Sequence, residues 1–162
     1  MTGQPLDGVK TATSAAIDKL GPNDCVAVIA FDSAPTTIVA MHPLNDPQAV
    51  KAAIARIQAG GGTDMLSGLD AAHKALAVQT AARKKHVVLM TDGMSPIAGL
   101  QQLAQTMNGE HMTITTIGYG TSLDEQTLKM LSSTAAGRYF HVGDPTAFTT
   151  VFSRDVDITL AP

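Results

Sequence analysis

Two side chains with oxygen ligands stand beside glycines in different parts of the chain. Thr63 follows the triple glycine at residues 60–62, and Asp92 follows an apolar run and precedes Gly93. A hydroxyl and a carboxylate that meet at one end of a sheet suit a hard divalent cation, which prefers oxygen ligands and keeps some water. Each residue also has a plainer interpretation, since Thr63 could cap a helix and Asp92 could belong to an Asp-Gly turn. Two ligands alone do not make a metal site.

Other kinds of active site find little support in the motifs. The glycine run lacks the Lys-Ser/Thr of a phosphate-binding loop, and Gly118-Tyr119-Gly120 is too short for a dinucleotide fingerprint. No Gly-x-Ser-x-Gly elbow is present, which argues against a hydrolase of that class. The histidines have no metal-ligand spacing, and we expect them at the surface or at strand edges. They are His42, His73, His86, His111 and His141.

The composition predicts a single globular domain and excludes several partners. The chain has 162 residues, 44% of them apolar and 15% charged. Eleven basic and fourteen acidic residues give a net charge of −3, and apart from residues 83–85 the basic residues are scattered, so we expect no nucleic-acid partner. No apolar run approaches the roughly 20 residues of a membrane span. A single cysteine, Cys25, is expected to be a buried inert thiol, and the compartment stays open between cytoplasm and bacterial envelope.

Hydrophobic periodicity predicts alternating strands and helices. Helices are expected over residues 6–20, 50–57, 65–76, 97–107, 124–133 and from 146, and strands over 25–31, 36–41, 86–90, 112–119 and 139–142. Residues 157–160 are a further candidate strand. The first two strands are close enough to form an antiparallel hairpin, and the rest indicate right-handed βαβ units. The predicted fold is therefore α/β, with a doubly wound, mostly parallel sheet flanked by helices.

In such a sheet the ligand site lies at the carboxyl ends of the strands. The loops after residues 31, 90 and 119, together with residues 60–64, are therefore the ones to inspect. Four methionines, Met65, Met90, Met112 and Met130, occupy positions typical of a core. Met94 follows Asp92-Gly93 directly, and we expect it to be exposed at the site.

Four motifs, in order, resemble the von Willebrand factor type A (VWA) domain family in its bacterial form. Residues 1–12 resemble its first helix, and residues 24–31 its second strand. Residues 60–64 resemble the loop that carries its metal-site threonine, and residues 89–93 the strand end that carries its metal-site aspartate. The match assigns residues 1–154 to a partial VWA domain and leaves residues 155–162 as a C-terminal tail.

The resemblance implies a Rossmann-like fold with a metal-ion-dependent adhesion site (MIDAS) and no enzymatic activity. In the family an Asp-x-Ser-x-Ser loop, a threonine and an aspartate hold Mg²⁺, or Mn²⁺ or Ca²⁺, and an acidic side chain of a partner protein completes the coordination. By position, Thr63 would coordinate through its hydroxyl, and Asp92 directly or through water. Asp64, Gly93 and Met94 would face the partner.

The resemblance also implies a departure, because the Asp-x-Ser-x-Ser loop and the strand before it would precede Met1. We therefore expect an N-terminally truncated domain that lacks its central first strand, between residues 25–31 and 86–90. Too few ligands would remain for tight cation binding by this chain. The two bare strand edges would pair with a second copy, by edge pairing or strand swapping, or be closed by residues 156–160.

Two other functions remain open at this stage. One is a divalent-metal-dependent hydrolase or phosphatase, which needs a second strand-end acid; Asp32 is the only spare one, and Lys84 and Lys85 lie at the opposite end of their strand. The other is a structural domain of a larger envelope protein. The sequence names neither the partner nor the parent architecture.

Overall fold

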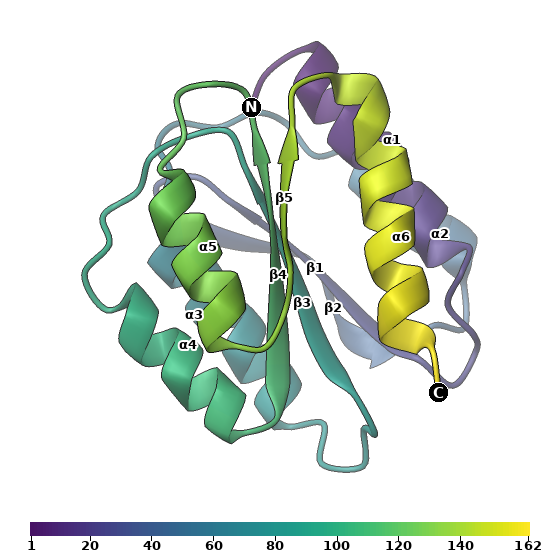
Figure 1. Ribbon diagram of the computed structural model, residues 1–162. Coiled ribbons are helices and arrows are strands. Elements are labelled where there is room, and N and C mark those ends of the chain that lie inside the picture. The colour runs from purple at the N-terminus through teal and green to yellow at the C-terminus, as the bar shows by residue number, and fades with distance from the viewer.

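The computed structural model describes residues 1–162 and alternates helices with strands (Figure 1). The helices are α1 (Gln4–Ile17), α2 (Pro47–Ala55), α3 (Met65–Ala77), α4 (Leu100–Gly109), α5 (Glu125–Thr134) and α6 (Phe148–Leu160), with a short 3₁₀ turn, η1 (Pro145–Ala147), before α6. The strands are β1 (Cys25–Phe31), β2 (Pro35–Pro43), β3 (Lys85–Thr91), β4 (Met112–Tyr119) and β5 (Tyr139–Val142). The predicted order of helices and strands is confirmed.

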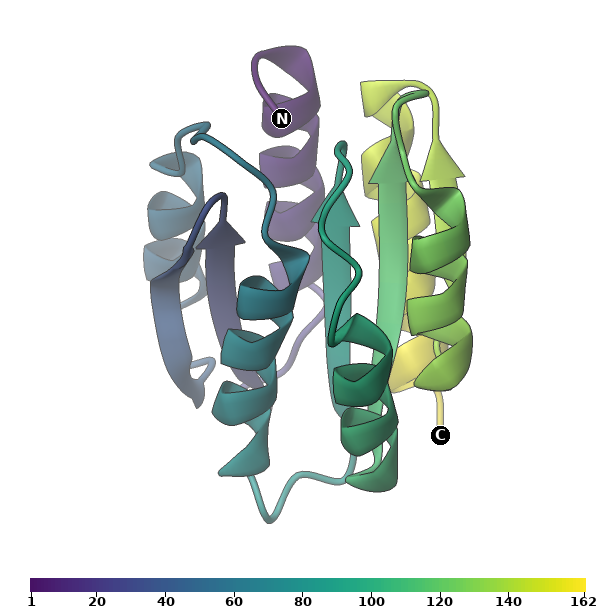
Figure 2. The same cartoon turned by 90° about the vertical axis from the view of Figure 1, so that its left-hand side faces the viewer.

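The strands form two separate ladders. β1 and β2 are an antiparallel hairpin, as predicted, whereas β3, β4 and β5 pair in parallel in that order. In Figure 2 the arrows of β1 and β3 point the same way, and no strand lies between them. β1 pairs only with β2, and β3 only with β4, so each has one edge without a hydrogen-bonded neighbour. The expectation of two bare edges flanking a missing strand is confirmed for these residues.

Burial reflects this gap. β4, which has a partner on both sides, is buried at six of its eight positions, whereas the more apolar β1 has no buried residue. β1 is nevertheless a continuous apolar run, Cys-Val-Ala-Val-Ile-Ala-Phe, of the kind that is normally covered on both faces. β1 is therefore less buried than its apolar composition predicts.

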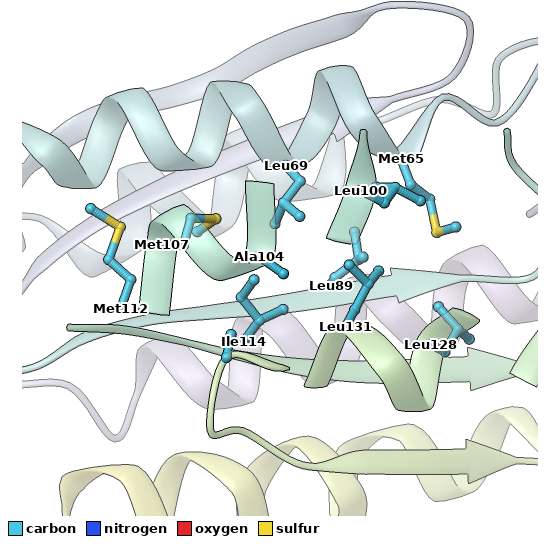
Figure 3. Packing of buried hydrophobic residues seen from close by; sticks show 11 residues of the cluster. Met65, Leu69, Leu89, Leu100, Ala104, Met107, Met112, Ile114, Leu128 and Leu131 are labelled. Carbon is cyan, nitrogen blue, oxygen red and sulfur yellow. The ribbon is translucent and has the colours of Figure 1, made fainter. Parts of the chain in front are cut away.

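Helices cover both faces of the strands and build three cores. α3, α4 and α5 lie on one face, and α1 and α6 lie on the other (Figure 1). Figure 3 shows the largest core, in which side chains of α3, α4 and α5 meet Leu89 of β3 and Ile114 of β4. A second core joins α1 and α6 to β4 and β5 around Phe148, and a third joins α1 and α2 to the hairpin around Ile54. Met65 and Met112 are buried and Met90 and Met130 partly buried, as predicted for core methionines.

The C-terminal residues are helical, which corrects the expectation of a terminal strand. Residues 157–160 are the last turn of α6 and not a strand, so residues 156–160 do not close the gap in the sheet. Most of residues 155–162, which the sequence assigns to a C-terminal tail, continue this helix. The reason is Asp155, a fully buried carboxylate that fixes this part of α6 to the strands.

Three smaller differences also have local causes. Cys25 is exposed, because it begins a strand at the open end of the hairpin, so the expected buried thiol is wrong. α2 ends at Ala55, five residues before the glycines that were expected to stop it. His86 is not a simple edge residue, since its side chain is only 12% exposed and contacts Asp155. No helix of the chain has both the length and the apolar character of a membrane span.

Candidate functional site

Three connections meet at the carboxyl ends of β1 and β3, and we call them the rim loops (Figure 2). They are the turn at residues 32–34, the segment 56–64 that leads into α3, and the segment 92–99 that leads into α4. The carboxyl ends of the strands are where a site was predicted. Of the loops inspected there, only the one after β4 does not contribute to the contacts described below.

The turn after β1 holds the glycine loop in place. The main-chain carbonyl of Asp32 accepts from the amide of Asp64 at 2.6 Å, and its carboxylate accepts from the amide of Gly61 at 3.3 Å. Ser33 Oγ accepts from the amide of Gly62 at 3.1 Å. A Cβ at Gly60 would lie only 1.9 Å from Oδ2 of Asp32, so this approach requires glycine. The triple glycine therefore allows two backbones to dock closely.

Asp32 is thus occupied by backbone amides. Hydrogen bonds from the amides of Ala34 and Gly61 hold the pKa of its exposed carboxyl below the ordinary value. The carboxylate therefore helps to hold the glycine loop against the turn after β1.

Thr63 and Asp92, predicted from loops 29 residues apart, lie at the same place on the rim. A Cβ on Gly93, the residue after Asp92, would lie 2.8 Å from Oγ1 of Thr63. The Thr63 hydroxyl therefore packs directly against the backbone that follows Asp92. Both residues are half-buried, at the edge of solvent.

The carboxylate of Asp92 has a cationic neighbour. The N-terminal ammonium of Met1 donates to Oδ1 at 3.0 Å and lies 2.9 Å from Oδ2. Asp92 is about one-third exposed and the Met1 side chain is 9% exposed. The start of the described chain is therefore at the rim, next to the candidate ligands.

The residues expected to face a partner differ in their surroundings. Asp64 is the N-cap of α3, where its carboxylate accepts from the amide of Ser67 at 3.1 Å. Met94 is exposed, as predicted, with 69% of its surface accessible. Ser95, which the sequence did not place at the rim, accepts from the amide of Met65 through Oγ at 3.0 Å and ties the third loop to α3.

These donors can be tested against the needs of a divalent cation. Mg²⁺ favours six oxygen ligands in octahedral geometry. Among the described residues, the Thr63 hydroxyl packs against the backbone of Gly93, and the carboxylate of the preceding residue, Asp92, lies beside the amino group of Met1. No group of three or more His, Cys, Asp or Glu residues is placed to hold a metal ion. A hydroxyl and a carboxylate at one rim are fewer ligands than the six that Mg²⁺ favours.

Comparison with known protein families shows to which family the chain belongs. The sequence profile of the von Willebrand factor type A domain matches residues 1–154. The chain belongs to this family. The match covers all three rim loops, and a VWA domain is a Rossmann-like α/β fold, as predicted.

Relatives and solved structures agree with this assignment. An uncharacterized protein of Synechocystis is 29% identical over 172 residues; the alignment covers 99% of this chain but only 40% of that protein. A von Willebrand factor type A structure from Catenulispora acidiphila has a TM-score of 0.83 at 25% identity, with 93% of this chain and 37% of that one covered.

A third similarity concerns a metal. Proximal thread matrix protein 1 of the mussel byssus, solved with a zinc-occupied MIDAS motif, has a TM-score of 0.76 at 18% identity. The match covers 94% of this chain and 40% of the mussel protein's chain. At this identity the likeness shows the fold alone, and the zinc belongs to the mussel protein.

Proposed function

We propose that this VWA domain is a non-enzymatic protein-binding module that grips an acidic side chain of a partner through a divalent cation. The observation that carries the proposal is the contact between Thr63 and the backbone at Gly93, which brings a hydroxyl and the Asp92 carboxylate to one rim of a VWA fold. Such a hydroxyl and carboxylate are ligands that Mg²⁺ or Mn²⁺ accepts.

In this proposal Thr63 and Asp92 are the ligands from this chain, and an Asp-x-Ser-x-Ser loop of the kind found in the family would supply the rest. A bound cation would attract the partner's Asp or Glu. Gly93 is required because any side chain there would press on Thr63. Met94 offers exposed apolar surface beside the cation, and Asp64 fixes the start of α3 behind it.

Calorimetry tests this proposal. Mg²⁺ is titrated into the 162-residue chain and into a longer form that carries a strand and an Asp-x-Ser-x-Ser loop ahead of Met1. We expect measurable binding only in the longer form, and its loss in Thr63→Ala and Asp92→Asn variants. The matched controls are Thr11→Ala and Asp18→Asn on or beside α1, away from the rim. Micromolar binding by the 162-residue chain, or binding unaffected by both rim variants, would refute the assignment.

For the 162-residue chain itself, we propose that the bare edges of β1 and β3 pair with a second copy. An unpaired, apolar strand edge is a template for another strand. Sedimentation velocity over a range of concentrations should show a dimer. A monomer at all concentrations, with the amides on both bare edges exchanging rapidly with solvent, would contradict this proposal.

A further inference from the structure

Two large apolar side chains are presented together on the loop that leaves the rim toward α4. Met94 is 69% exposed and Ile97, three residues later, is 60% exposed. Single exposed apolar side chains need no explanation, but neighbouring ones beside a groove are typical of an interaction surface. Among the other large apolar residues with high exposure, only Val78 is as exposed as these two.

The loop that carries them is held at three points. Gly93 packs against Thr63, Ser95 Oγ accepts from the amide of Met65, and Gly99, with φ of +84°, packs against Leu66. Each contact ties the loop to the start of α3. A backbone fixed in this way presents Met94 and Ile97 with little conformational entropy left to lose on binding.

A groove between α3 and α4 continues this surface. It is an open hollow of about 480 Å³, and Leu66 and Gly99 line it where the loop ends. Leu66 and Leu103 supply its apolar lining, and its charged residues are Asp64 and Asp70, with no Lys, Arg or His among the lining residues. The lining therefore combines two leucines with acidic and neutral polar side chains, and it includes no cationic residue.

Asp64 caps α3 through the amide of Ser67, so Asp70 is the acid of the groove that remains available to a partner. Asp70 pairs with Lys74 one turn along α3 at 2.6 Å, but the side chains are 42% and 75% exposed. An exposed pair of this kind contributes little and is easily exchanged for another cation. A partner's Lys or Arg can therefore take the place of Lys74.

We propose that the α3/α4 groove, together with Met94 and Ile97, docks an amphipathic segment of a partner protein that carries Lys or Arg beside apolar residues. Apolar side chains of the segment cover Met94, Ile97, Leu66 and Leu103, and its cation pairs with Asp70. Charge complementarity selects this occupant over an acidic one. The surface needs no metal, so it can be tested independently of the proposed cation site.

An NMR titration with two peptides tests this inference. One synthetic peptide alternates leucine and lysine in an amphipathic pattern, and the other has glutamate at each lysine position. With the ¹⁵N-labelled 162-residue chain, we expect the leucine–lysine peptide to shift the amides of Leu66, Asp70, Gly99 and Leu103. The glutamate peptide should leave them unmoved. Raising the salt concentration should weaken the binding.

Matched variants separate the contributions of Asp70 and of the exposed apolar pair, Met94 and Ile97, to peptide binding. Asp70→Asn should weaken binding about two- to fivefold, and the double change Met94→Ser with Ile97→Ser on the order of tenfold. Asp157→Asn on α6 and Val78→Ser at the far end of α3 should change it by less than about twofold, since both residues are exposed but lie away from the groove. The proposal would be overturned by equal shifts with both peptides, by shifts that map to other surfaces, or by no binding at all. An equal effect of the control variants would also overturn it.

Discussion

At the rim, single residues set how closely three loops can approach one another. Gly93 is the tightest of these points for the proposed site, because its missing side chain leaves room for the Thr63 hydroxyl. Asp32 is the second, because its carboxylate and carbonyl both accept from the glycine loop. Neither residue is a proposed ligand, yet both determine where Thr63 lies.

We predict that Gly93→Ala destabilises the fold and displaces Thr63. The new Cβ would lie 2.8 Å from Thr63 Oγ1, so one of the two loops must move. The free energy of unfolding should fall by about 1–3 kcal/mol, as measured by urea denaturation. Gly109→Ala is the control, since nothing lies near that Cβ in the last turn of α4, and it should be neutral or slightly stabilising. Equal stabilities for the two variants would contradict the close contact.

We also predict that Asp32 titrates below the ordinary aspartate pKa. Hydrogen bonds from the amides of Ala34 and Gly61 favour its ionised form. The ionised carboxylate stabilises the loop at pH values above the ordinary aspartate pKa. This contribution is lost as the pH falls through the depressed pKa of Asp32. The amide of Gly61, followed by NMR from neutral pH downward, should report a midpoint below about 3.9. A midpoint at or above that value would show that the amides do not hold the carboxylate.

Among the helices, α6 has the strongest polar attachment to the sheet. Asp155 is fully buried and accepts from Thr115 and Arg138 through Oδ1 and contacts His86 Nε2 at 2.8 Å through Oδ2. Burial would raise the pKa of Asp155, but the hydrogen bonds and charge of His86, with bonds from Thr115 and Arg138, hold it below the ordinary value. One carboxylate thus joins α6 to β3, β4 and the residue before β5.

Asp155→Asn should therefore lower the free energy of unfolding by about 3–5 kcal/mol, because it leaves the half-buried Arg138 guanidinium without a counter-charge and breaks a buried hydrogen-bond network. The wild-type chain should lose stability as the pH falls through the depressed pKa of Asp155, and the variant should lose less over that range. Urea denaturation between neutral and acidic pH measures both effects. Asp157→Asn, whose side chain is 61% exposed, should change stability by less than about 1 kcal/mol. A variant as acid-sensitive as the wild type would contradict this role.

The two-part sheet predicts an uneven pattern of hydrogen exchange. In a parallel strand with one partner, only about half of the amides are bonded to that partner. Amides of β3 that face β4 should be protected, those that face the gap should exchange faster, and β4 should be protected throughout. Mass spectrometry after exchange of a dilute sample measures the pattern. Full protection of β3 in a monomer would show that something already pairs with its open edge.

The helices and strands could be predicted because their signals are local. Apolar spacing located β1, β3 and β4, and the position of Thr63 and Asp92 after glycines and after a strand located the rim. The contacts that hold the rim loops together could not be predicted. Asp32 and Gly61, like Ser95 and Met65, lie about 30 residues apart, and no motif marks either contact. The same holds for His86 and Asp155, which lie 69 residues apart. The pattern just after Asp155, at residues 157–160, also indicates a strand rather than the end of a helix.

At the scale of the whole molecule, a VWA fold contains a sheet with two bare inner edges and places Thr63 and Asp92, the proposed cation ligands, at one rim. The net charge of −3 gives no large field of either sign, so recognition must depend on local features: the rim, the bare edges and the α3/α4 groove. The chain spans 40% of the Synechocystis relative and 37% of the Catenulispora acidiphila structure.

Paramagnetic relaxation by Mn²⁺ tests the central claim most directly. Traces of Mn²⁺ are added to the ¹⁵N-labelled longer form that carries a strand and an Asp-x-Ser-x-Ser loop ahead of Met1, and the loss of amide signals is mapped along the chain. We expect the amide signals of Thr63, Asp92 and Gly93 to broaden first and excess Mg²⁺ to restore them. Broadening that centres on other acidic residues, such as Asp124 or Asp144, with the rim unaffected, would contradict this expectation.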